Sequence, residues 1–264
     1  MKLGKIKYAL LPTLLAAYYA HPARALIGGE RAEINQFPGQ ISLRRATGRH
    51  FCGATKIAPR LMITAAHCLH PEEGAIELKS ELKPEFKKGG KFSIAEGPDL
   101  TAPLRVVSLH TDLIWEAPKE AGLKAAPDLA LIQTREEITG VSEAVVMTTP
   151  LRVGAEVVVT GMGCQTQEGG DSGQELDFGK ARVSGFQFSS FRFPSDPVQG
   201  TSIALCPGDS GGGTYVENSG RFELVGVNSA ITGMQDAAFS IVSRLDASGG
   251  AGFLSFVIGM LGSK

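Results

Sequence analysis

The apolar residues of the chain fall into short runs rather than into long helical stripes. The clearest runs are rich in Val, Ile, Leu or Phe, and Gly, Pro or Asp residues often bound them, which is typical of β-strands. These runs are Gln40–Leu43, Leu61–Ala65, Leu104–Leu109, Leu129–Thr134, Glu156–Thr160, Phe222–Asn228 and Phe239–Val242. A convincing amphipathic helix occurs only at Gly252–Leu261. The pattern therefore predicts an all-β fold with a C-terminal helix.

Polar stretches between these runs predict loops and a division into two halves. Glu72–Lys91 mixes acids and bases and predicts a solvated hairpin and loop, and Gly169–Gly173 predicts a flexible surface loop. Ser142–Val153 is the expected link between the halves. We therefore expect one domain over residues 26–264, with an N-terminal half at 26–145 and a C-terminal half at 146–264.

The first 25 residues have the three parts of a secretory signal peptide. A start with three lysines precedes the apolar run Tyr8–Ala20, and the segment ends in Ala23-Arg24-Ala25. The apolar run is too short to span a bilayer comfortably, so we expect no membrane anchor. The sequence predicts a secreted protein, which is extracellular, or periplasmic if the source is a Gram-negative bacterium.

The charge of the mature chain bears on its partners. Residues 1–25 hold four of the 26 basic residues and none of the 27 acidic ones, so the mature chain has a net charge of −5. An acidic balance argues against nucleic acid as a partner.

The four cysteines are Cys52, Cys68, Cys164 and Cys206. An even number in an exported chain predicts two disulfides, and the count alone leaves three pairings open. No Cys-x-x-Cys pattern occurs, so we expect no zinc site, and nothing else in the sequence calls for a metal or a cofactor.

A serine among glycines is the first candidate for chemistry. Ser210 lies in Gly208-Asp209-Ser210-Gly211-Gly212, where small neighbours let a carbonyl group approach the hydroxyl and let backbone N–H groups face an oxyanion. The pattern also matches the nucleophile turn of α/β-hydrolases, which needs a histidine after the serine. All five histidines precede Ser210, which excludes the α/β-hydrolase class. They are His21, His50, His67, His70 and His110.

His67 is the candidate general base, and Asp128 is the candidate acid that orients it. His67 follows an apolar run and small residues in Thr64–Cys68, whereas His50, His70 and His110 sit among polar or loop residues. Asp128 stands at the head of the apolar run Leu129–Ile132. A charged residue at the head of a buried strand needs either a compensating partner or a position at the surface. Asp112 competes for this role, and we prefer Asp128 because its strand is longer and more apolar.

Together these segments resemble the chymotrypsin-like serine peptidases. The matching motifs occur in the family's order along the chain: Leu26–Glu30, Phe51–Gly53, Thr64–Cys68, Asp128–Ile132, Thr160–Gly163 and Cys206–Gly213. The resemblance implies two six-stranded antiparallel β-barrels with the site in the cleft between them. It also implies a monomeric serine endopeptidase with protein or peptide substrates and protein inhibitors as partners.

Carried over by position, the resemblance assigns a role to each matching residue. Ser210 would be the nucleophile, His67 the base and then the acid, and Asp128 the residue that orients the imidazole. The N–H groups of Gly208 and Ser210 would form the oxyanion hole, and Ser229 would lie against Asp128.

The resemblance also implies a substrate pocket without charge. Its matching positions are Ala204, Leu205, Ser229, Ile231 and Ala237. Ala204 stands where trypsin-like enzymes carry Asp, and Ile231 would fill part of the pocket, so we expect a preference for small aliphatic residues such as Ala or Val before the cut bond. If the alignment slips by one residue, the carboxylate of Asp236 would restore a preference for Lys or Arg.

Activation and disulfides follow from the same resemblance. The family pairs a new N-terminal ammonium with an aspartate, here Leu26 and Asp209, and it staples the histidine loop through the pair that matches Cys52–Cys68. The family's usual partner for Cys206 would lie near Met234, where no cysteine occurs. Its turn matching Gly161–Gly163 folds close to the segment before the nucleophile, which implies a Cys164–Cys206 bridge. Two further departures are Met162, where Trp is usual, and Gly213, where Pro is usual.

Overall fold

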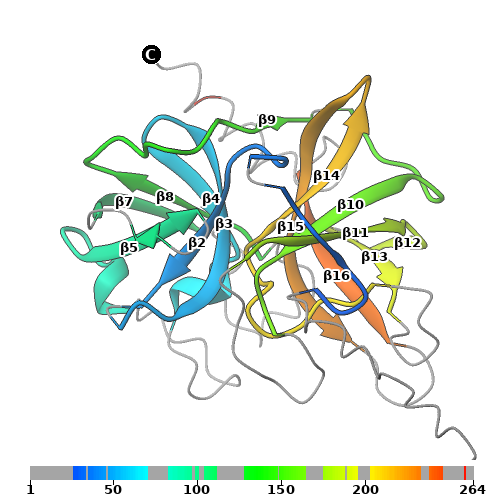
Figure 1. The fold of residues 1–264 in the computed structure, drawn as a ribbon, viewed down its shortest axis with the longest axis horizontal. Helices are drawn as coiled ribbons and strands as arrows, with labels where there is room; N and C mark the ends of the chain where they lie inside the picture. The colour runs from blue at the N-terminus through cyan, green and yellow to red at the C-terminus, as the bar shows by residue number, and fades with distance from the viewer. Residues whose placement is uncertain are drawn as a thin grey trace, which may run out of the picture.

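The described strands form two sheets, the first from β2–β8 and the second from β9–β16 together with β1 (Figure 1). The structure is a computed structural model. It describes residues 26–33, 35–45, 47–70, 83–96, 99–100, 104–111, 128–147, 149–164, 175–187, 189–195, 203–232, 238–245 and 259. Within these ranges the named elements are sixteen strands and two short 3₁₀ helices, η1 (Ala66–Leu69) and η2 (Pro84–Phe86).

The first sheet closes into a barrel. Its strands are β2 (Gln40–Arg44), β3 (His50–Ala58), β4 (Leu61–Thr64), β5 (Lys91–Glu96), β6 (Asp99–Leu100), β7 (Leu104–Thr111) and β8 (Ala130–Thr134). They run in the order β2-β3-β4-β8-β7-β5-β6, and β5 also pairs with β2. Six antiparallel strands therefore form a closed barrel, with β6 attached to β5.

The second sheet is built from the later strands and from the start of the chain. Its strands are β1 (Glu30–Arg31), β9 (Val145–Val146), β10 (Glu156–Gly161), β11 (Asp177–Arg182), β12 (Gly185–Gln187), β13 (Ser190–Pro194), β14 (Gly213–Asn218), β15 (Arg221–Thr232) and β16 (Phe239–Arg244). They run in the order β1-β11-β10-β14-β15-β16-β13-β12, and β9 pairs in parallel with β15.

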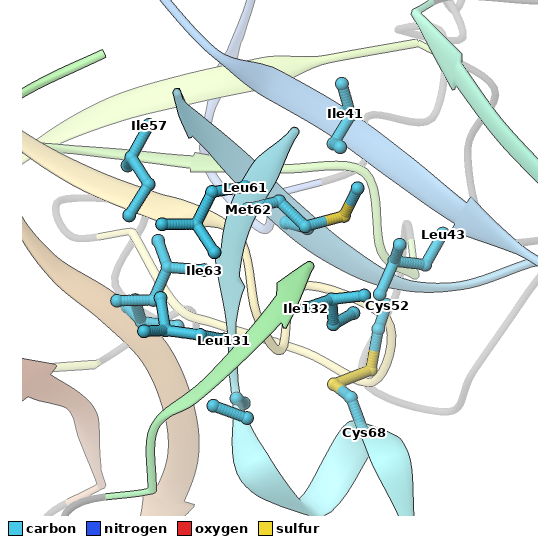
Figure 2. Close-up of a cluster of buried hydrophobic side chains, with 14 of the residues drawn as sticks. Ile41, Leu43, Cys52, Ile57, Leu61, Met62, Ile63, Cys68, Leu131 and Ile132 are labelled. Atoms are coloured by element: carbon cyan, nitrogen blue, oxygen red, sulfur yellow. A yellow bond between two sulfur atoms is a disulfide. The ribbon is translucent and has the colours of Figure 1, made fainter. Parts of the chain in front are cut away.

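Apolar side chains fill the interior of each half. In the first half, fully buried residues of β2, β4 and β8 pack together beside the Cys52–Cys68 disulfide, as Figure 2 shows for Ile41, Met62, Ile63 and Leu131. Burying one such side chain contributes roughly 1.5–3 kcal/mol. In the second half the core holds Val157, Val159, Phe191, Phe193 and Val225.

A buried polar seam joins the two halves. The Nε2 of Gln40 on β2 donates to the hydroxyl of Tyr215 on β14 at 2.7 Å and to Thr55 Oγ1 at 2.7 Å. The Oε1 of Gln40 accepts from Thr160 Oγ1 at 3.0 Å, and Tyr215 donates to the carbonyl oxygen of Pro38 at 2.7 Å. Satisfied buried networks of this kind fix one arrangement of the groups that they connect.

The predicted all-β fold class is confirmed, and each of the seven predicted runs coincides largely with a strand. Ser142–Val153 does run from the first barrel to the second sheet, and it contains β9. The division at residue 145 stays a prediction, although residues 26–31 lie with the second sheet. Of the predicted C-terminal helix only Gly259 is described, in helical conformation.

Three other sequence predictions concern residues outside the described ranges. They are the signal peptide at residues 1–25, the loop at 169–173 and residues 71–82 of the charged segment. No helix within the described ranges has the length and apolar character needed to cross a membrane.

Candidate active site

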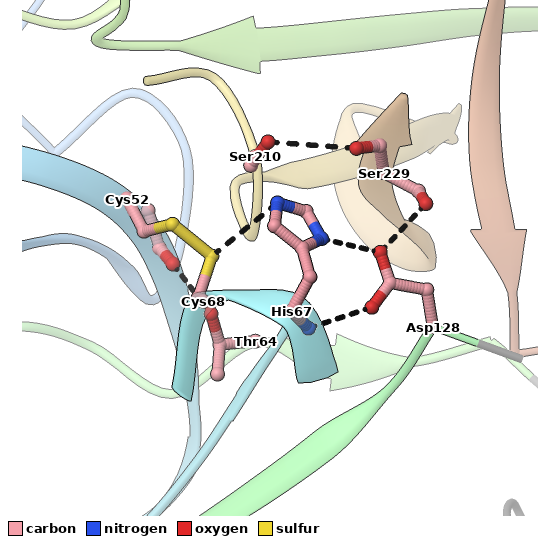
Figure 3. A network of polar contacts seen from close by, with 8 residues as sticks. Cys52, Thr64, His67, Cys68, Asp128, Ser210 and Ser229 are labelled. Carbon is pink, nitrogen blue, oxygen red and sulfur yellow. Dashed lines mark hydrogen bonds and ion pairs between the residues drawn. A yellow bond between two sulfur atoms is a disulfide. The ribbon is translucent and has the colours of Figure 1, made fainter. Parts of the chain in front are cut away.

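His67 and Asp128 are brought together by neighbouring strands of the barrel. β4 pairs with β8 so that Thr64 lies opposite Ala130, which places η1 beside Asp128, two residues before β8. The backbone N–H of His67 donates to Asp128 Oδ1 at 2.9 Å, and His67 Nδ1 lies 2.6 Å from Asp128 Oδ2 (Figure 3). A proton on Nδ1 satisfies this contact and leaves Nε2 as the proton acceptor of the ring.

Asp128 is buried but held in its ionised form. It is 7% exposed. Burial acts to raise the pKa of Asp128, but the hydrogen bonds and charge of His67 and the hydroxyl of Ser229, which donates at 2.7 Å, outweigh burial and hold the pKa below its ordinary value. The carboxylate is therefore negative at neutral pH and can stabilise a positive imidazole.

Ser210 lies in the loop before β14 and is joined to this pair through Ser229. The Oγ of Ser210 donates to the carbonyl oxygen of Ser229 at 3.4 Å, while the hydroxyl of Ser229 binds Asp128 (Figure 3). The carbonyl oxygen of Ser210 accepts from the N–H of Gly53 on β3 at 2.7 Å. A hydrogen bond of 3.4 Å is weak, so rotation about the side-chain bond of Ser210 costs little.

The segment before Ser210 forms a tight turn, and only glycine fits at position 208 of that turn. Gly208 has a φ of +99°, and a Cβ there would lie 2.8 Å from the Cα of Gly163. The N–H of Asp209 donates to the carbonyl oxygen of Cys206 at 3.0 Å, which closes the turn. Of the predicted oxyanion hole, the N–H of Gly208 is part of this turn, and the N–H of Ser210 belongs to the next turn, which Gly212 closes by donating to the carbonyl oxygen of Asp209 at 3.1 Å.

His50 is a functional candidate that the sequence analysis missed. Its neighbours in the sequence are polar and loop residues, but it is only 4% exposed at the start of β3. Its Nε2 donates to the carbonyl oxygen of Gly208 at 2.8 Å, and its Nδ1 accepts from Ser42 Oγ at 2.7 Å. His50 therefore supports the turn of the predicted oxyanion hole. Its position directly before the Phe51–Gly53 motif was the available signal.

The burial of His50 predicts a loss of stability in acid. Burial lowers the pKa of His50 to about 4, against the hydrogen bond to Gly208, which acts to raise it. In the unfolded chain this histidine takes up a proton below its ordinary pKa of 6.5, whereas the folded chain accepts the proton only near pH 4. The stability is therefore full above pH 6.5 and falls as the pH drops toward 4, by about 3 kcal/mol for this group.

Urea unfolding of the wild type and of His50→Gln at several pH values checks this expectation. The amide of Gln can still donate to Gly208 but does not titrate, so the variant should lose about 3 kcal/mol less between about pH 7 and about pH 4. Parallel pH profiles for the two proteins would contradict the assigned role.

The predicted pocket positions differ in exposure. Ala204 and Leu205 are buried; the N–H of Ala204 donates to the carbonyl oxygen of Ile27 at 3.0 Å, and that of Leu205 to Ser240 Oγ at 3.0 Å. Ile231 follows Ser229 by two residues on β15, and it is 45% exposed. Ala237, Asp236 and the competing acid Asp112 lie outside the described residues.

Leu26 and Asp209, the predicted activation pair, are both buried. Asp209 is 1% exposed; its Oδ1 accepts from the N–H of Gly163 and its Oδ2 from that of Cys206, each at 2.8 Å. Burial raises the pKa of Asp209 well above its ordinary value, although the two amides act to lower it. A nearby positive charge would strongly stabilise the ionised form of such a buried carboxylate.

The cysteines form the two bridges Cys52–Cys68 and Cys164–Cys206, with Cα–Cα distances of 6.2 Å and 5.7 Å. The first staples η1 to β3, and the second holds the turn before Gly208 to the end of β10. Cys52, His67 and Cys68 lie close enough to hold a metal by distance alone. Because both sulfurs are already joined in the disulfide, these residues do not make a thiolate metal site.

Comparisons with known proteins bear on family and fold. The family model described as Trypsin matches residues 26–246. Hypodermin-B of Hypoderma lineatum is 38% identical over 76 residues, covering 29% of this chain and 27% of that protein. A tryptase of Mus musculus is 37% identical over 75 residues, covering 26% and 28%. The matched segment thus spans little more than a quarter of each relative.

Solved structures extend the likeness over most of the chain. Human heparin binding protein matches with a TM-score of 0.66 and 20% identity, covering 90% of this chain and 97% of that chain. A mutant of the same protein matches with a TM-score of 0.65 and 19% identity, covering 88% and 96%. At this identity the likeness concerns the fold, and it confirms the predicted two-barrel architecture.

Proposed function

The chain belongs to the trypsin family, and we propose that it is a secreted serine endopeptidase that acts through Ser210, His67 and Asp128. Members of this family act on protein substrates. The observation that carries the proposal is the hydrogen-bonded chain from His67 through Asp128 and Ser229 to Ser210, to which both halves of the fold contribute. A serine hydroxyl, an imidazole and a buried carboxylate that orients the imidazole are the groups that acyl transfer needs.

In the first half of the reaction, the Oγ of Ser210 attacks the carbonyl carbon of the substrate. Nε2 of His67 takes the hydroxyl proton, and the ionised Asp128 stabilises the resulting imidazolium through Nδ1–H. The carbonyl oxygen becomes an oxyanion, which accepts hydrogen bonds from the N–H groups of Gly208 and Ser210. His67 then gives its proton to the leaving nitrogen, the C–N bond breaks, and an acyl-enzyme remains.

In the second half, water replaces the leaving amine. His67 removes a proton from this water as it attacks the ester carbon, and the oxyanion forms again in the same place. The ester bond to Ser210 breaks, and its Oγ recovers the proton from His67. This step releases the carboxylic acid product and returns the enzyme to its starting state.

The substrate pocket is proposed to be short and apolar. Ala204 offers no charge for a buried Lys or Arg head, which would need one. The side chain of Ile231 would reduce the space for long side chains. We therefore expect a preference for Ala or Val immediately before the cut bond.

Peptides that differ only in the residue before the cut bond test this preference. We expect kcat/KM to be highest for Ala and Val, lower for Leu and Phe, and lowest for Lys and Arg. Ile231→Gly should raise kcat/KM for Leu and Phe, by an amount corresponding to about 1–3 kcal/mol per methylene admitted. The neighbouring Thr232→Ala, on the opposite face of β15, is the matched control. A preference of the wild type for Lys or Arg would show that the pocket is assigned wrongly.

Signal peptidase is proposed to generate the active N-terminus directly. The small residues Ala23 and Ala25 place its cut before Leu26, which is buried in the structure. The new ammonium would then pair with Asp209 without a separate activating protease. N-terminal sequencing of the secreted protein is expected to read Leu-Ile-Gly-Gly, and a mature form that begins at His21 would contradict direct activation.

A fluorophosphonate probe tests the proposed function as a whole. We expect the mature protein to be labelled at Ser210 and to cut peptides from a library. A protein that is not labelled is a binding or adhesion module on the same fold, and one that is labelled but cuts only esters is an esterase. Either result would overturn the proposed peptidase.

A further inference from the structure

The first strand, β1, lies beside the buried carboxylate of Asp177, in a row of residues that leads to Asp209. β1 pairs with β11 so that Arg31 lies opposite Asp177, and β11 pairs with β10 so that Asp177 lies opposite Gly161. Arg31, Asp177 and Gly161 therefore form one row across three adjacent strands. A Cβ on Gly161 would overlap the Oδ1 of Asp209. The Gly161 end of the row thus lies against the side chain of Asp209, the carboxylate expected to receive the N-terminus.

Asp177 is a buried charge held by the first strand. Its side chain is fully buried, and its Oδ1 accepts from the Nε of Arg31 at 2.7 Å. Arg31 also pairs with Glu175, whose side chain is 62% exposed. The ion pair with Arg31 compensates the cost of burying this carboxylate, and it fixes the position of the Asp177 side chain.

The two carboxylates act on each other. Burial is the largest cause that raises the pKa of Asp209, and the negative charge of Asp177 adds to it. The described hydrogen-bond partners of Asp209 are the amides of Gly163 and Cys206, which carry no full charge. A positive group that enters between the carboxylates would relieve the burial cost of Asp209 and the repulsion from Asp177 together.

Resting on the proposed function, we propose that Asp177 is a positioning residue for the N-terminus. It adds its negative charge to that of Asp209 in attracting the ammonium of Leu26, and the hydrogen bond from Arg31 holds its side chain in place. In an uncut chain the nitrogen of Leu26 is a neutral amide, so the pull of the two carboxylates acts only after cleavage. Cleavage before Leu26 thus creates the ammonium, and Arg31 on the strand β1 that follows helps to hold the carboxylate that attracts it.

Chemical modification of the N-terminus tests this without relying on catalysis. The protein is the mature chain beginning at Leu26 with Ser210→Ala, and the probe is cyanate, which carbamylates free amines. The rate at the α-amino group is followed by mass spectrometry from about pH 6 to about pH 10. Asp177→Asn keeps the shape but removes the charge, and we expect the α-amino group to react about tenfold faster near neutral pH, with its titration midpoint lowered by about one pH unit.

Three further variants make the outcome decisive. Glu175→Gln is the matched control; it also loses a partner of Arg31, but at an exposed site, so the rate should stay at the wild-type value. Arg31→Gln lies on the exposed strand β1 and serves if Asp177→Asn does not fold; losing the ion pair that positions Asp177 should speed the reaction several-fold. Asp209→Asn should expose the amine most.

Two other outcomes of the carbamylation experiment would contradict this inference, and they differ in what they imply for the proposed function. If Asp209→Asn exposes the amine while Asp177→Asn and Arg31→Gln leave it as in the wild type, Asp177 has no such role and the proposed peptidase stands. If the amine already reacts at the rate of a free amine in the parent protein, the N-terminus is not held at Asp209. In that case the proposed activation fails together with this inference.

Discussion

Replacing Ser210 by Ala is expected to lower kcat for peptide hydrolysis by about 10⁶-fold. The change removes a single oxygen atom, and with it the group that forms the covalent intermediate. The apolar cores and the polar seam are not touched, so substrate binding and stability should stay near the wild-type values. Steady-state kinetics, and thermal unfolding of both proteins, measure the two effects separately.

Ser142→Ala is the matched control for Ser210→Ala, because Ser142 is exposed in the link between the halves. It should leave kcat unchanged. Ser229→Ala should show an intermediate loss of roughly 10- to 100-fold, because it removes one hydrogen bond to the buried carboxylate of Asp128. If Ser210→Ala keeps more than a small fraction of the activity, another residue is the nucleophile.

Asp128→Asn is expected to lower kcat by about 10⁴-fold near neutral pH. The amide of Asn can donate a hydrogen bond to Nδ1 of His67, which moves the ring proton to Nε2 and leaves no acceptor for the proton of Ser210. It also withdraws the negative charge that stabilises the imidazolium. The measurement is the dependence of kcat on pH, in which the loss should be greatest at neutral pH.

Glu136→Gln provides the control for this carboxylate-to-amide change. Glu136 pairs with Arg105 on β7 at 2.7 Å and is not among the predicted site residues. Its loss should not change kcat. Wild-type activity in Asp128→Asn would return Asp112, the competing acid, to consideration.

The sequence predicted most of the strands because their apolar residues face a core. β4 and β8, which carry Met62, Ile63, Leu131 and Ile132, are clear cases. β3 did not stand out, because it buries Thr55 and Lys56, whose polar atoms find partners far away in the chain. Burial of such groups depends on hydrogen bonds between distant segments, which a local pattern does not reveal.

The residues of the candidate site that lie in a recognisable sequence motif could be predicted from the sequence. His67, Asp128 and Ser210 were selected by chain order and by their neighbours, and the structure places the first two in direct contact. His50 was missed because its role comes from a contact with Gly208, which lies 158 positions later. Asp177 was missed for a similar reason, since its importance depends on strand register.

The three proposed catalytic residues come from both halves of the fold, and this has a consequence for the protein while it is still folding. His67 and Asp128 belong to the first barrel, whereas Ser210 and Ser229 belong to the second sheet. Contacts between such distant segments form late in folding, because long loops must close first. A chain with only one half folded therefore lacks the proposed active site, so the proposed peptidase could not cut unfolded copies of itself, which are the most easily cleaved, until both halves have folded.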